Sequence, residues 1–275
     1  MINTPVSVCC PDDLGKLDPV SQGVLCLRCG RLFSSEDEIP ELLPFQAFQE
    51  SSAESVQMNA YRAGFSTRPE RAWRRPLAVF LNGLGNGYLY RWAARALGNL
   101  SGGQPLTVLD AACGEGILGR YLSPRHAYTG IDFSTRLLTR AKRYNPASYF
   151  RADLHHLPFP NNTFDAVVSL QALQYLHRPQ DALAQIARVL KPGGALLLTV
   201  PNNESFKYRL QGIPSVQLQR FDRQSLPALL AGSFQDARAR TRGIWVPLPK
   251  LPLHAPGAYP VRWGLSWTVI ARPRK

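Results

Sequence analysis

The sequence lacks a long hydrophobic run and the marks of a secretory leader. No stretch approaches 18 consecutive apolar residues, so we expect no membrane-spanning helix. The first residues, MINTPVSVCCPDD, have neither the basic nor the apolar part of a signal peptide. We also find no internal repeat. These absences predict a cytoplasmic protein.

Lysine is scarce, and acidic residues are scarce after the first 60 positions. Arginine outnumbers lysine 26 to 6. Residues 1–60 hold 3 basic and 9 acidic side chains, whereas residues 61–275 hold 29 and 10, a local balance of +19. Such a surface attracts polyanions such as RNA or acidic lipid headgroups. The same composition is also what a GC-rich genome produces, and no run of five or six basic residues occurs.

Cysteine is nearly confined to the N-terminal segment, and its spacing there is not that of an ordinary disulfide scaffold. The chain has Cys9, Cys10, Cys26, Cys29 and Cys113. A C-x-x-C spacing in a reducing compartment favours metal over a disulfide. The segment closes with IPELLP, in which Pro40 and Pro44 preclude a continuous helix. We therefore expect residues 1–48 to form a small loop-rich unit.

The rest of the chain divides into a helical segment and an α/β domain. Residues 49–103 have helix-period apolar spacing and are predicted to form a helical cap or linker. Residues 104–275 are predicted to form the main domain. Strands are expected at 106–112, 127–133, 148–154, 164–170, 193–200, 235–243 and 265–273, and helices at 116–122, 134–144, 179–190 and 222–234. Alternating strands and helices predict a doubly wound, mostly parallel, seven-stranded sheet.

Two stretches of the main domain are expected to differ from that pattern. Residues 235–243, QDARARTRG, predict a polar edge strand. Residues 244–264 are rich in proline and aromatic residues, and are predicted to be too broken for a regular element.

The stretch LTVLDAACGEG, residues 106–116, predicts a buried strand that ends in a glycine turn. Gly114 and Gly116 let a ligand approach the backbone, and the helix that follows directs its N–H groups at an anionic group. With Gly119 they also fit the G-x-G-x-x-G spacing of dinucleotide sites. Asp110 opposes that interpretation, because it would crowd a pyrophosphate but could accept hydrogen bonds from an ammonium group.

Acidic residues are predicted at the ends of three strands. Asp110 follows the first, Asp132 the second and Asp153 the third. Alone, each is as well explained as a helix N-cap or a turn residue. Together they would lie at one edge of a parallel sheet, where ligands of such sheets bind. Asp132 suits ribose hydroxyls, and Asp153 suits an adenine amino group.

Four stretches carry a resemblance to a known family: VLDAACGEG (108–116), YTGIDFS (128–134), ADLHHLPFPNNTFDAVVSLQALQYL (152–176) and RVLKPGGALLLTVPN (188–202). In this order and spacing they resemble the class I S-adenosylmethionine-dependent methyltransferases, most closely the branch with the quinone-biosynthesis enzymes. The resemblance implies a Rossmann-like fold and S-adenosylmethionine as cofactor. It implies cofactor contacts from Asp110, Ala112, Gly114, Gly116, Asp132, Phe133, Asp153, Leu154, Leu170 and Gln171.

The resemblance further implies methyl transfer to a small organic acceptor, at oxygen, nitrogen or carbon. A sulfonium is already a good leaving group, so no protein nucleophile is required. Candidates for a catalytic role are Gln171, Tyr175 and His254, whereas His155 and His156 are expected in a solvated loop. The acceptor pocket is expected among residues 49–98, 203–220 and 243–263. Its candidate aromatic residues are Trp245, Tyr259 and Trp263, which equally suit packing.

Two alternatives have other partners. A ribosomal RNA (guanine) methyltransferase fits the basic surface and a cluster of arginines at Arg62, Arg68, Arg71, Arg74 and Arg75. The chain lacks the Asp/Asn-Pro-Pro-Tyr signature of amino-group methylation on bases and a Pro-Cys pair for attack on cytosine, which opposes those two classes. A non-catalytic S-adenosylmethionine-binding subunit that docks a partner is the second alternative. The oligomeric state is not indicated by the sequence.

The N-terminal cysteines resemble a small zinc ribbon, as found in ribosomal RNA guanine methyltransferases and in the activator subunit of tRNA methyltransferases. The resemblance implies a structural zinc ion held by Cys10, Asp13, Cys26 and Cys29, with Asp13 where the family has cysteine. Cys9 is the alternative fourth ligand. A degenerate ribbon without metal stays open as well.

Overall fold

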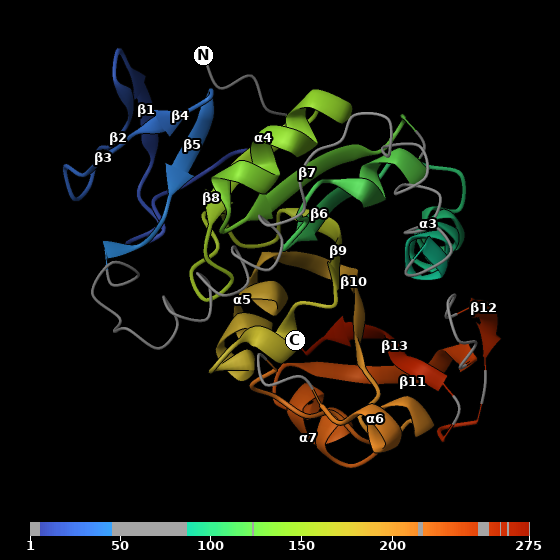
Figure 1. The fold of residues 1–275 in the computed structure, drawn as a ribbon. Coiled ribbons are helices and arrows are strands. Elements are labelled where there is room, and N and C mark those ends of the chain that lie inside the picture. Colours follow the sequence, from blue (N-terminus) through green and yellow to red (C-terminus); the bar gives the residue numbers. More distant parts are fainter. Residues whose placement is uncertain are drawn as a thin grey trace.

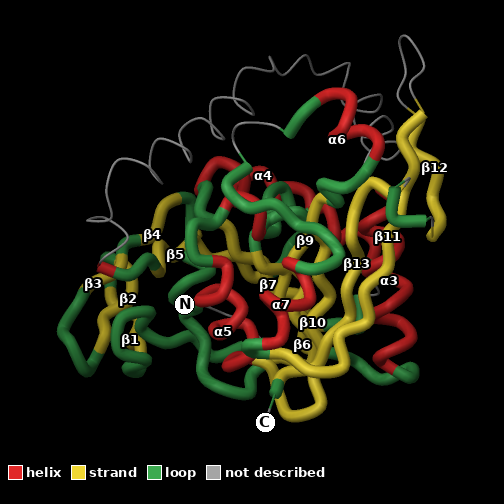
Figure 2. Tube along the Cα trace, turned by 90° about the horizontal axis from the view of Figure 1, so that it is seen from below, coloured by secondary structure: helices red, strands yellow, loops and turns green. Residues whose placement is uncertain are grey.

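The computed structural model describes residues 6–45, 87–122, 124–213, 217–246, 253–258, 260–262 and 264–274. Its centre is a ten-stranded sheet in the order β12-β11-β13-β10-β9-β6-β7-β8-β5-β4 (Figures 1 and 2). Seven of these strands match the prediction: β6 (Thr107–Ala111), β7 (Ala127–Asp132), β8 (Ser148–Ala152), β9 (Phe164–Leu170), β10 (Leu190–Pro201), β11 (Phe234–Val246) and β13 (Gly264–Pro273). The five from β6 to β10 are parallel to their neighbours, and β13 and β11 are antiparallel. The doubly wound fold class is confirmed.

Helices cover both faces of the sheet because strand residues point alternately to two cores. Val108 and Leu197 pack in one cluster, and Leu109 and Leu196 pack in the other. The first cluster is completed by α3 (Gly87–Ser101), the 3-10 helix η3 (Ile117–Tyr121) and α4 (Thr135–Tyr144). The second is completed by α5 (Pro179–Val189) and α7 (Ser225–Ala231). A short helix, α6 (Phe206–Gln211), follows β10.

The outer part of the sheet differs from the prediction. The strand β12 (Leu253–Ala258) pairs antiparallel with β11, so β11 lies inside the sheet and not at its edge. The prediction that residues 244–264 hold no regular element is therefore wrong for 253–258, and also for 244–246, which continue β11. Pro256 is compatible with this strand, because an edge strand has one side without a partner to donate to. Residues 116–122 form the predicted turn of helix, but as a 3-10 helix.

The N-terminal segment is built from very short strands. A three-stranded sheet joins β1 (Leu17–Val20), β2 (Gly23–Cys26) and β3 (Leu32–Phe33). The strands β4 (Ser35–Glu36) and β5 (Ile39–Leu42) leave this unit and join the large sheet, where β5 runs parallel to β8. The loop-rich unit is present as expected, and its last strands extend the main sheet (Figure 1). Ile39 and Leu42 are fully buried there.

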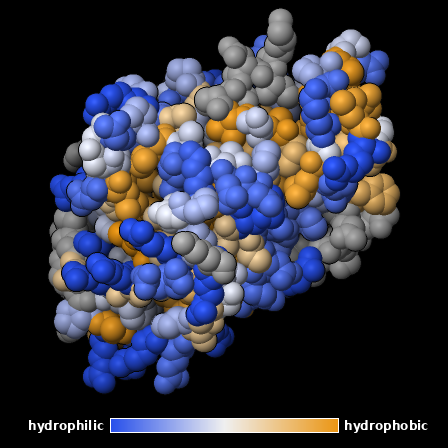
Figure 3. Space-filling view, turned by 180° about the vertical axis from the view of Figure 1, so that it is seen from behind, coloured by the Kyte–Doolittle hydropathy of each residue, from blue (hydrophilic) through white to orange (hydrophobic). Residues whose placement is uncertain are grey.

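Part of the predicted helical segment can be placed. Residues 87–101 form α3, which packs on β9 and β10, and the helices predicted for 49–86 lie outside the described residues. Within the described part of the chain, no helix is long and apolar enough to cross a membrane. The face opposite that of Figure 1 presents apolar side chains interspersed with hydrophilic ones (Figure 3).

Candidate active site

The glycine turn after β6 is held in a backbone conformation that is rare for most residues. Ala112 has φ 68°, Gly114 has φ 55° and Gly116 has φ 64°. A Cβ atom added to Gly116 would lie 2.8 Å from the hydroxyl oxygen of Tyr149, whereas one added to Gly114 would meet nothing within 4 Å. Gly116 therefore lets the turn pack on β8, and Gly114 leaves the turn open to a ligand. The strained Ala112 is typical of a ligand-binding turn.

Asp110 is a buried carboxyl group next to this turn. Asp110 is only 3% exposed, and its carboxyl group accepts a hydrogen bond of 2.7 Å from the Tyr128 hydroxyl. Burial raises the pKa of Asp110 to about 7, and the negative charge of Asp132 adds to that rise. An ammonium group placed beside it would stabilise the ionised form. Sequence reasoning missed Tyr128, whose only signal is its place two residues before Gly130, the partner of Asp110 in the β6–β7 register.

Asp132 ends β7 and faces the glycine turn. Its two carboxylate oxygens accept hydrogen bonds from the backbone N–H groups of Gly114 and Ser134, each at 2.9 Å. These bonds fix the side chain between the turn and the start of α4. A carboxylate has about four acceptor positions, so a carboxylate in this place can also accept bonds from ribose hydroxyls.

Phe133 follows directly and is fixed from the N-terminal segment. The Arg151 Nε donates to the Phe133 carbonyl oxygen at 3.0 Å, and the Arg151 guanidinium lies 5.3 Å from the centre of the Phe133 ring. The same guanidinium forms an ion pair with Glu41 on β5. A residue predicted to flank adenine is thus held in place by an ion pair that links the main sheet to the N-terminal segment.

Asp153 lies at the end of the third strand, as predicted, and its loop folds back on it. Its Oδ1 accepts the His155 backbone N–H at 2.9 Å and lies 2.8 Å from His155 Nδ1. Burial alone would raise the pKa of Asp153, but the hydrogen bonds and charge of His155 lower it below its usual range. The carboxylate is therefore ionised at neutral pH and available as an acceptor.

His155 is buried, with 7% exposure, so the prediction of a solvated loop is wrong for this residue. The reason is that the loop 153–160 is covered from two sides. Its own Leu157 and Phe159 are fully buried in the core, and on the other side the backbone N–H of Cys9 donates to the Pro158 carbonyl oxygen at 2.9 Å. His156 is half-buried and lines a cavity together with Cys29.

The end of β9 carries the residues expected to face the methyl group. Gln171, which follows Leu170, has φ 58°, and its backbone N–H donates to the Thr199 carbonyl oxygen at 2.9 Å. Its side-chain nitrogen lies 3.3 Å from Thr199 Oγ1. Tyr175 ends the short 3-10 helix η4 (Leu173–Tyr175), and burial raises the pKa of its phenol. Leu170, Gln171 and Tyr175 thus belong to one strand end.

His254 does not lie at that strand end. Its backbone pairs with Trp245 on the outermost strand β12, and β11, β13 and β10 separate β12 from β9. At about 4.8 Å per strand, this distance is roughly 19 Å between backbones. Tyr259, Trp263 and the five clustered arginines at 62, 68, 71, 74 and 75 lie outside the described residues.

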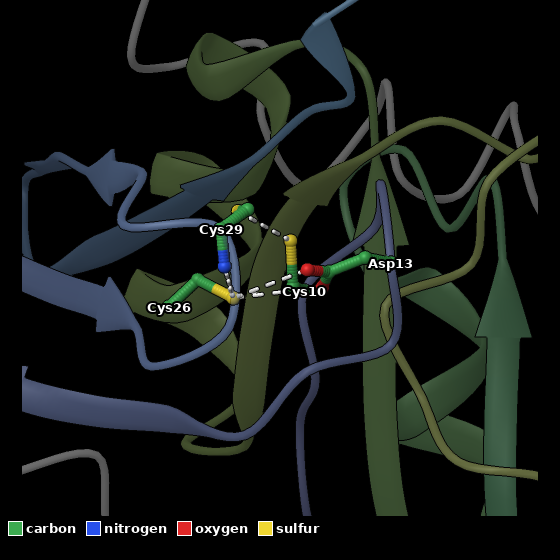
Figure 4. Close-up of side chains that lie close together, drawn as sticks. All are labelled: Cys10, Asp13, Cys26 and Cys29. Atoms are coloured by element: carbon green, nitrogen blue, oxygen red, sulfur yellow. Dashed lines mark hydrogen bonds between the residues drawn. The ribbon is translucent and has the colours of Figure 1, made fainter.

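The four predicted metal ligands lie together in the N-terminal segment (Figure 4). One ligand atom from each of Cys10, Asp13, Cys26 and Cys29 falls within 4.8 Å of all the others. The Cys10 and Cys29 sulfur atoms are 3.8 Å apart. Two thiolates on a tetrahedral zinc ion at 2.3 Å would be about 3.8 Å apart, so the spacing suits such an ion. Cys9 is not in this set, which favours Asp13 over Cys9 as the fourth ligand.

The local backbone orients two of these ligands. The N–H groups of Arg28 and Cys29 donate to Cys26 Sγ at 3.4 and 3.5 Å, and the Gly15 N–H donates to Asp13 Oδ1 at 2.8 Å. Burial alone would raise the pKa of the Cys26 thiol, but hydrogen bonds from the N–H donors bring that pKa below its usual range. This arrangement favours the thiolate that a metal ion requires.

Comparison with known proteins matches residues 109–198 to a family model described as a methyltransferase domain. The chain is 28% identical over 193 residues to the uncharacterized chloroplastic methyltransferase At2g41040 of Arabidopsis thaliana, with 64% of this chain and 53% of that protein covered. It is 37% identical over 100 residues to a demethylmenaquinone methyltransferase of Chlamydia trachomatis, with 34% and 44% covered. The chain thus spans about half of these relatives' length.

The fold also has solved counterparts. A Thermotoga maritima protein, described as an S-adenosylmethionine-dependent methyltransferase and possible histamine N-methyltransferase, superposes with a TM-score of 0.53 at 17% identity. The match covers 72% of this chain and 94% of that one. At this identity the likeness supports the fold.

Proposed function

We propose that this chain, which carries a class I S-adenosylmethionine-dependent methyltransferase domain, transfers a methyl group from S-adenosylmethionine to a small organic acceptor. The observation that carries the proposal is the set of three carboxylates, Asp110, Asp132 and Asp153, at successive strand ends around one open glycine turn. The two curated relatives above are methyltransferases by name, and one acts on demethylmenaquinone.

The proposed cofactor contacts rest on the resemblance to class I methyltransferases together with the local chemistry. The buried carboxylate of Asp110 would accept from the ammonium group, with the backbone of Ala112, Gly114 and Gly116 around the methionyl part. Asp132 would accept from the ribose hydroxyls. The adenine would lie beside Phe133, where Asp153 accepts from its amino group and the Leu154 backbone N–H donates to its ring. Leu170 and Gln171 would face the methyl group.

The chemistry needs mainly positioning and exclusion of water. S-adenosylmethionine supplies a methyl group on a positively charged sulfur, and the acceptor atom forms its bond to carbon as the carbon–sulfur bond breaks. Gln171, held by Thr199, shapes the wall beside that carbon. Tyr175 keeps its proton at neutral pH because burial raises its pKa, so it suits a hydrogen-bond donor to the acceptor better than a base.

Structural zinc in the N-terminal ribbon is part of the proposal. Three thiolates and one carboxylate would supply four donors, the number that a tetrahedral zinc ion takes. The ion would lie apart from methyl transfer and would hold the two loops of the ribbon together. We keep the division into a ribbon (1–48), a helical segment (49–103) and a methyltransferase domain (104–275) as the working domain organisation.

The experiment is incubation of the purified protein with methyl-labelled S-adenosylmethionine and a fractionated cell extract. We expect label in the pool of small organic molecules, and none when Asp132 is replaced by alanine. Label in RNA would instead favour the ribosomal RNA alternative. Cofactor binding without any labelled product would favour a non-catalytic subunit that binds a partner.

A further inference from the structure

A cavity of about 640 Å³ lies between α3 and the outer strands β11 and β13, apart from the strand ends that carry the three carboxylates. Apolar groups of Trp92, Ala96, Leu100 and Ile270 line it. Its polar lining is cationic, from Arg91, Arg95 and Arg242, with Asn99 beside them. A volume between about 300 and 1,000 Å³ with an apolar lining and a few polar groups is typical of small-molecule sites.

The periodicity of two elements brings these arginines together. On α3, Ala93 and Leu97 are buried against the sheet, and Arg91 and Arg95 lie one turn apart on the flank. On β11, residues alternate between the two faces. The Arg238 position pairs with Ile270, which packs on the α3 side, so Arg242 four residues later lies on that side too.

Among the residues that the structure describes, no carboxylate forms an ion pair with any of these three guanidinium groups. Among the described residues, Arg91, Arg95 and Arg242 form no ion pair and no side-chain hydrogen bond. The Nε of Arg242 is buried without a hydrogen-bond partner. Burial and the charge of Arg240 lower the pKa of Arg242. The buried donor without an acceptor and the neighbouring charge of Arg240 both disfavour the ionised form of Arg242, and a bound anion would relieve both.

Tyr88 lines the cavity and also contacts a residue next to the proposed methyl-transfer site. The Tyr88 hydroxyl donates to Ser266 Oγ at 3.1 Å, and a Cβ atom at Gly243 would lie 2.6 Å from the Tyr88 ring. The Gln171 side-chain nitrogen lies 3.5 Å from the same Ser266 oxygen. The cavity lining therefore includes Tyr88, which shares Ser266 with Gln171, but none of the residues proposed to contact the cofactor.

We propose that this cavity binds a small amphipathic anion, whose aromatic or apolar body lies against Trp92, Leu100 and Ile270 and whose phosphate or carboxylate group is held by Arg91, Arg95 and Arg242. Planar guanidinium groups bind such oxyanions through paired hydrogen bonds, and arginine also stacks on aromatic rings. A neutral apolar molecule would leave the three charges uncompensated. A polyanion without an apolar body would leave the lining of Trp92, Leu100 and Ile270 unused.

The test is titration calorimetry of the full chain with 1-naphthyl phosphate, with 1-naphthol as the neutral match and inorganic phosphate as the anion alone. We expect 1-naphthyl phosphate to bind at least about tenfold more tightly than either part. Arg242→Gln and the double variant Arg91→Gln/Arg95→Gln should each weaken it by about tenfold or more. The matched control is Arg238→Gln, on the same face of the same strand but outside the cavity, which should leave the affinity unchanged.

Two further readouts make the result decisive. Binding of S-adenosylhomocysteine, measured on every variant, reports that the main domain is folded, and its loss in the wild type would concern the proposed function and not the cavity. Equal affinity for 1-naphthol, no binding of 1-naphthyl phosphate, or an unchanged affinity in Arg242→Gln would overturn the proposal. The proposal would also be overturned by a single-stranded RNA that displaces 1-naphthyl phosphate and binds more weakly to Arg238→Gln as well as to Arg242→Gln. The ligand would then be a nucleic acid that contacts arginines along the whole of β11.

Discussion

Beside β8, basic side chains pair with carboxylates from the N-terminal segment, whereas the three arginines around the cavity beside β11 pair with no carboxylate of the described residues. Arg151 pairs with Glu41, and Lys142 lies 2.5 Å from Glu38. Within the described residues, Arg91, Arg95 and Arg242 have no such partner. The net charge of +13 is therefore not spread evenly. The paired Arg151 links β8 to β5, whereas the arginines around the cavity are those for which we propose an anionic ligand.

The contrast between these two regions bears on why the chain is rich in arginine. Either a GC-rich genome or a polyanion partner accounts for many arginines, and counting cannot separate the two. The acidic residues of the first 60 positions partly neutralise the cofactor side of the molecule, because β4 and β5 bring Glu38 and Glu41 to α4 and β8.

The largest effect is expected from breaking the metal cluster near the β8 end. Cys26→Ala removes one of four proposed ligands, so the protein should lose its zinc and its melting temperature should fall by about 5 °C or more. Metal analysis and thermal unfolding check this. Cys9→Ala is the control, because Cys9 is buried beside the cluster but lies outside the ligand set, and it should keep the metal. Stoichiometric zinc in Cys26→Ala would contradict the assignment.

The second effect concerns the pH dependence of cofactor binding. Burial raises the pKa of Asp110 to about 7, and only its ionised form attracts an ammonium group. The affinity for S-adenosylmethionine should therefore rise between pH 5.5 and 7.5, by up to about tenfold per unit below pH 7. Asp110→Asn should weaken binding and flatten this slope, which calorimetry across that range measures. The exposed Asp181→Asn should keep the wild-type slope, and a slope retained in Asp110→Asn would contradict the role.

The same group predicts the opposite trend for stability without ligand. The pKa of Asp110 in the folded state, about 7, lies above its ordinary value of 3.8. Its contribution to stability is therefore fully present below about pH 4 and is lost as the pH rises through about 7. Asp110→Asn should remove this part of the pH dependence in urea unfolding. An unchanged profile would mean that the carboxyl is ionised in the folded protein well below pH 7.

The third-largest effect is expected from breaking the ion pair that links β5 to β8. Glu41→Gln leaves the guanidinium of Arg151, which is only 17% exposed, without its carboxylate. We expect a loss of about 1–2 kcal/mol in the free energy of unfolding, together with a few-fold loss of cofactor affinity through Phe133. Glu38→Gln is the control, because Glu38 is 88% exposed and its pair should contribute less than about 0.5 kcal/mol. Equal losses in both variants would show that burial does not distinguish the two pairs.

The smallest effect is expected at the β11 end. Arg242→Gln removes a charge that has no partner among the described residues, so the free energy of unfolding should stay within about 0.5 kcal/mol of the wild type or rise slightly. Urea unfolding checks this. A loss as large as that of Glu41→Gln would mean that Arg242 serves the fold, and the contrast between the two ends would disappear.

What sequence reasoning could predict was set by local pattern. Short apolar strands alternating with helices predicted the parallel sheet, and the strand ends then placed Asp110, Asp132 and Asp153 at one edge. The C-x-x-C spacing indicated a metal site, and the resemblance to a zinc ribbon implied the ligands Cys10, Asp13, Cys26 and Cys29, which the fold brings together. In each case the prediction depends on short motifs of a few neighbouring residues.

What it could not predict depends on pairings between distant segments. Nothing near Ile39 indicates that β5 will run beside β8, more than 100 residues later. The burial of His155 follows from the cover that the loop receives from the N-terminal segment through Cys9. The strand β12 was missed because Pro256 argues against a strand in general but not against one at an edge.

The central claim is that carboxylates at three strand ends hold one S-adenosyl nucleoside, and titration calorimetry with S-adenosylhomocysteine tests it most directly. The account predicts one site per chain in the wild-type protein and an affinity at least about 100-fold weaker in Asp132→Ala, about 2.7 kcal/mol. No binding to the wild type, or equal affinity in Asp132→Ala, would contradict it.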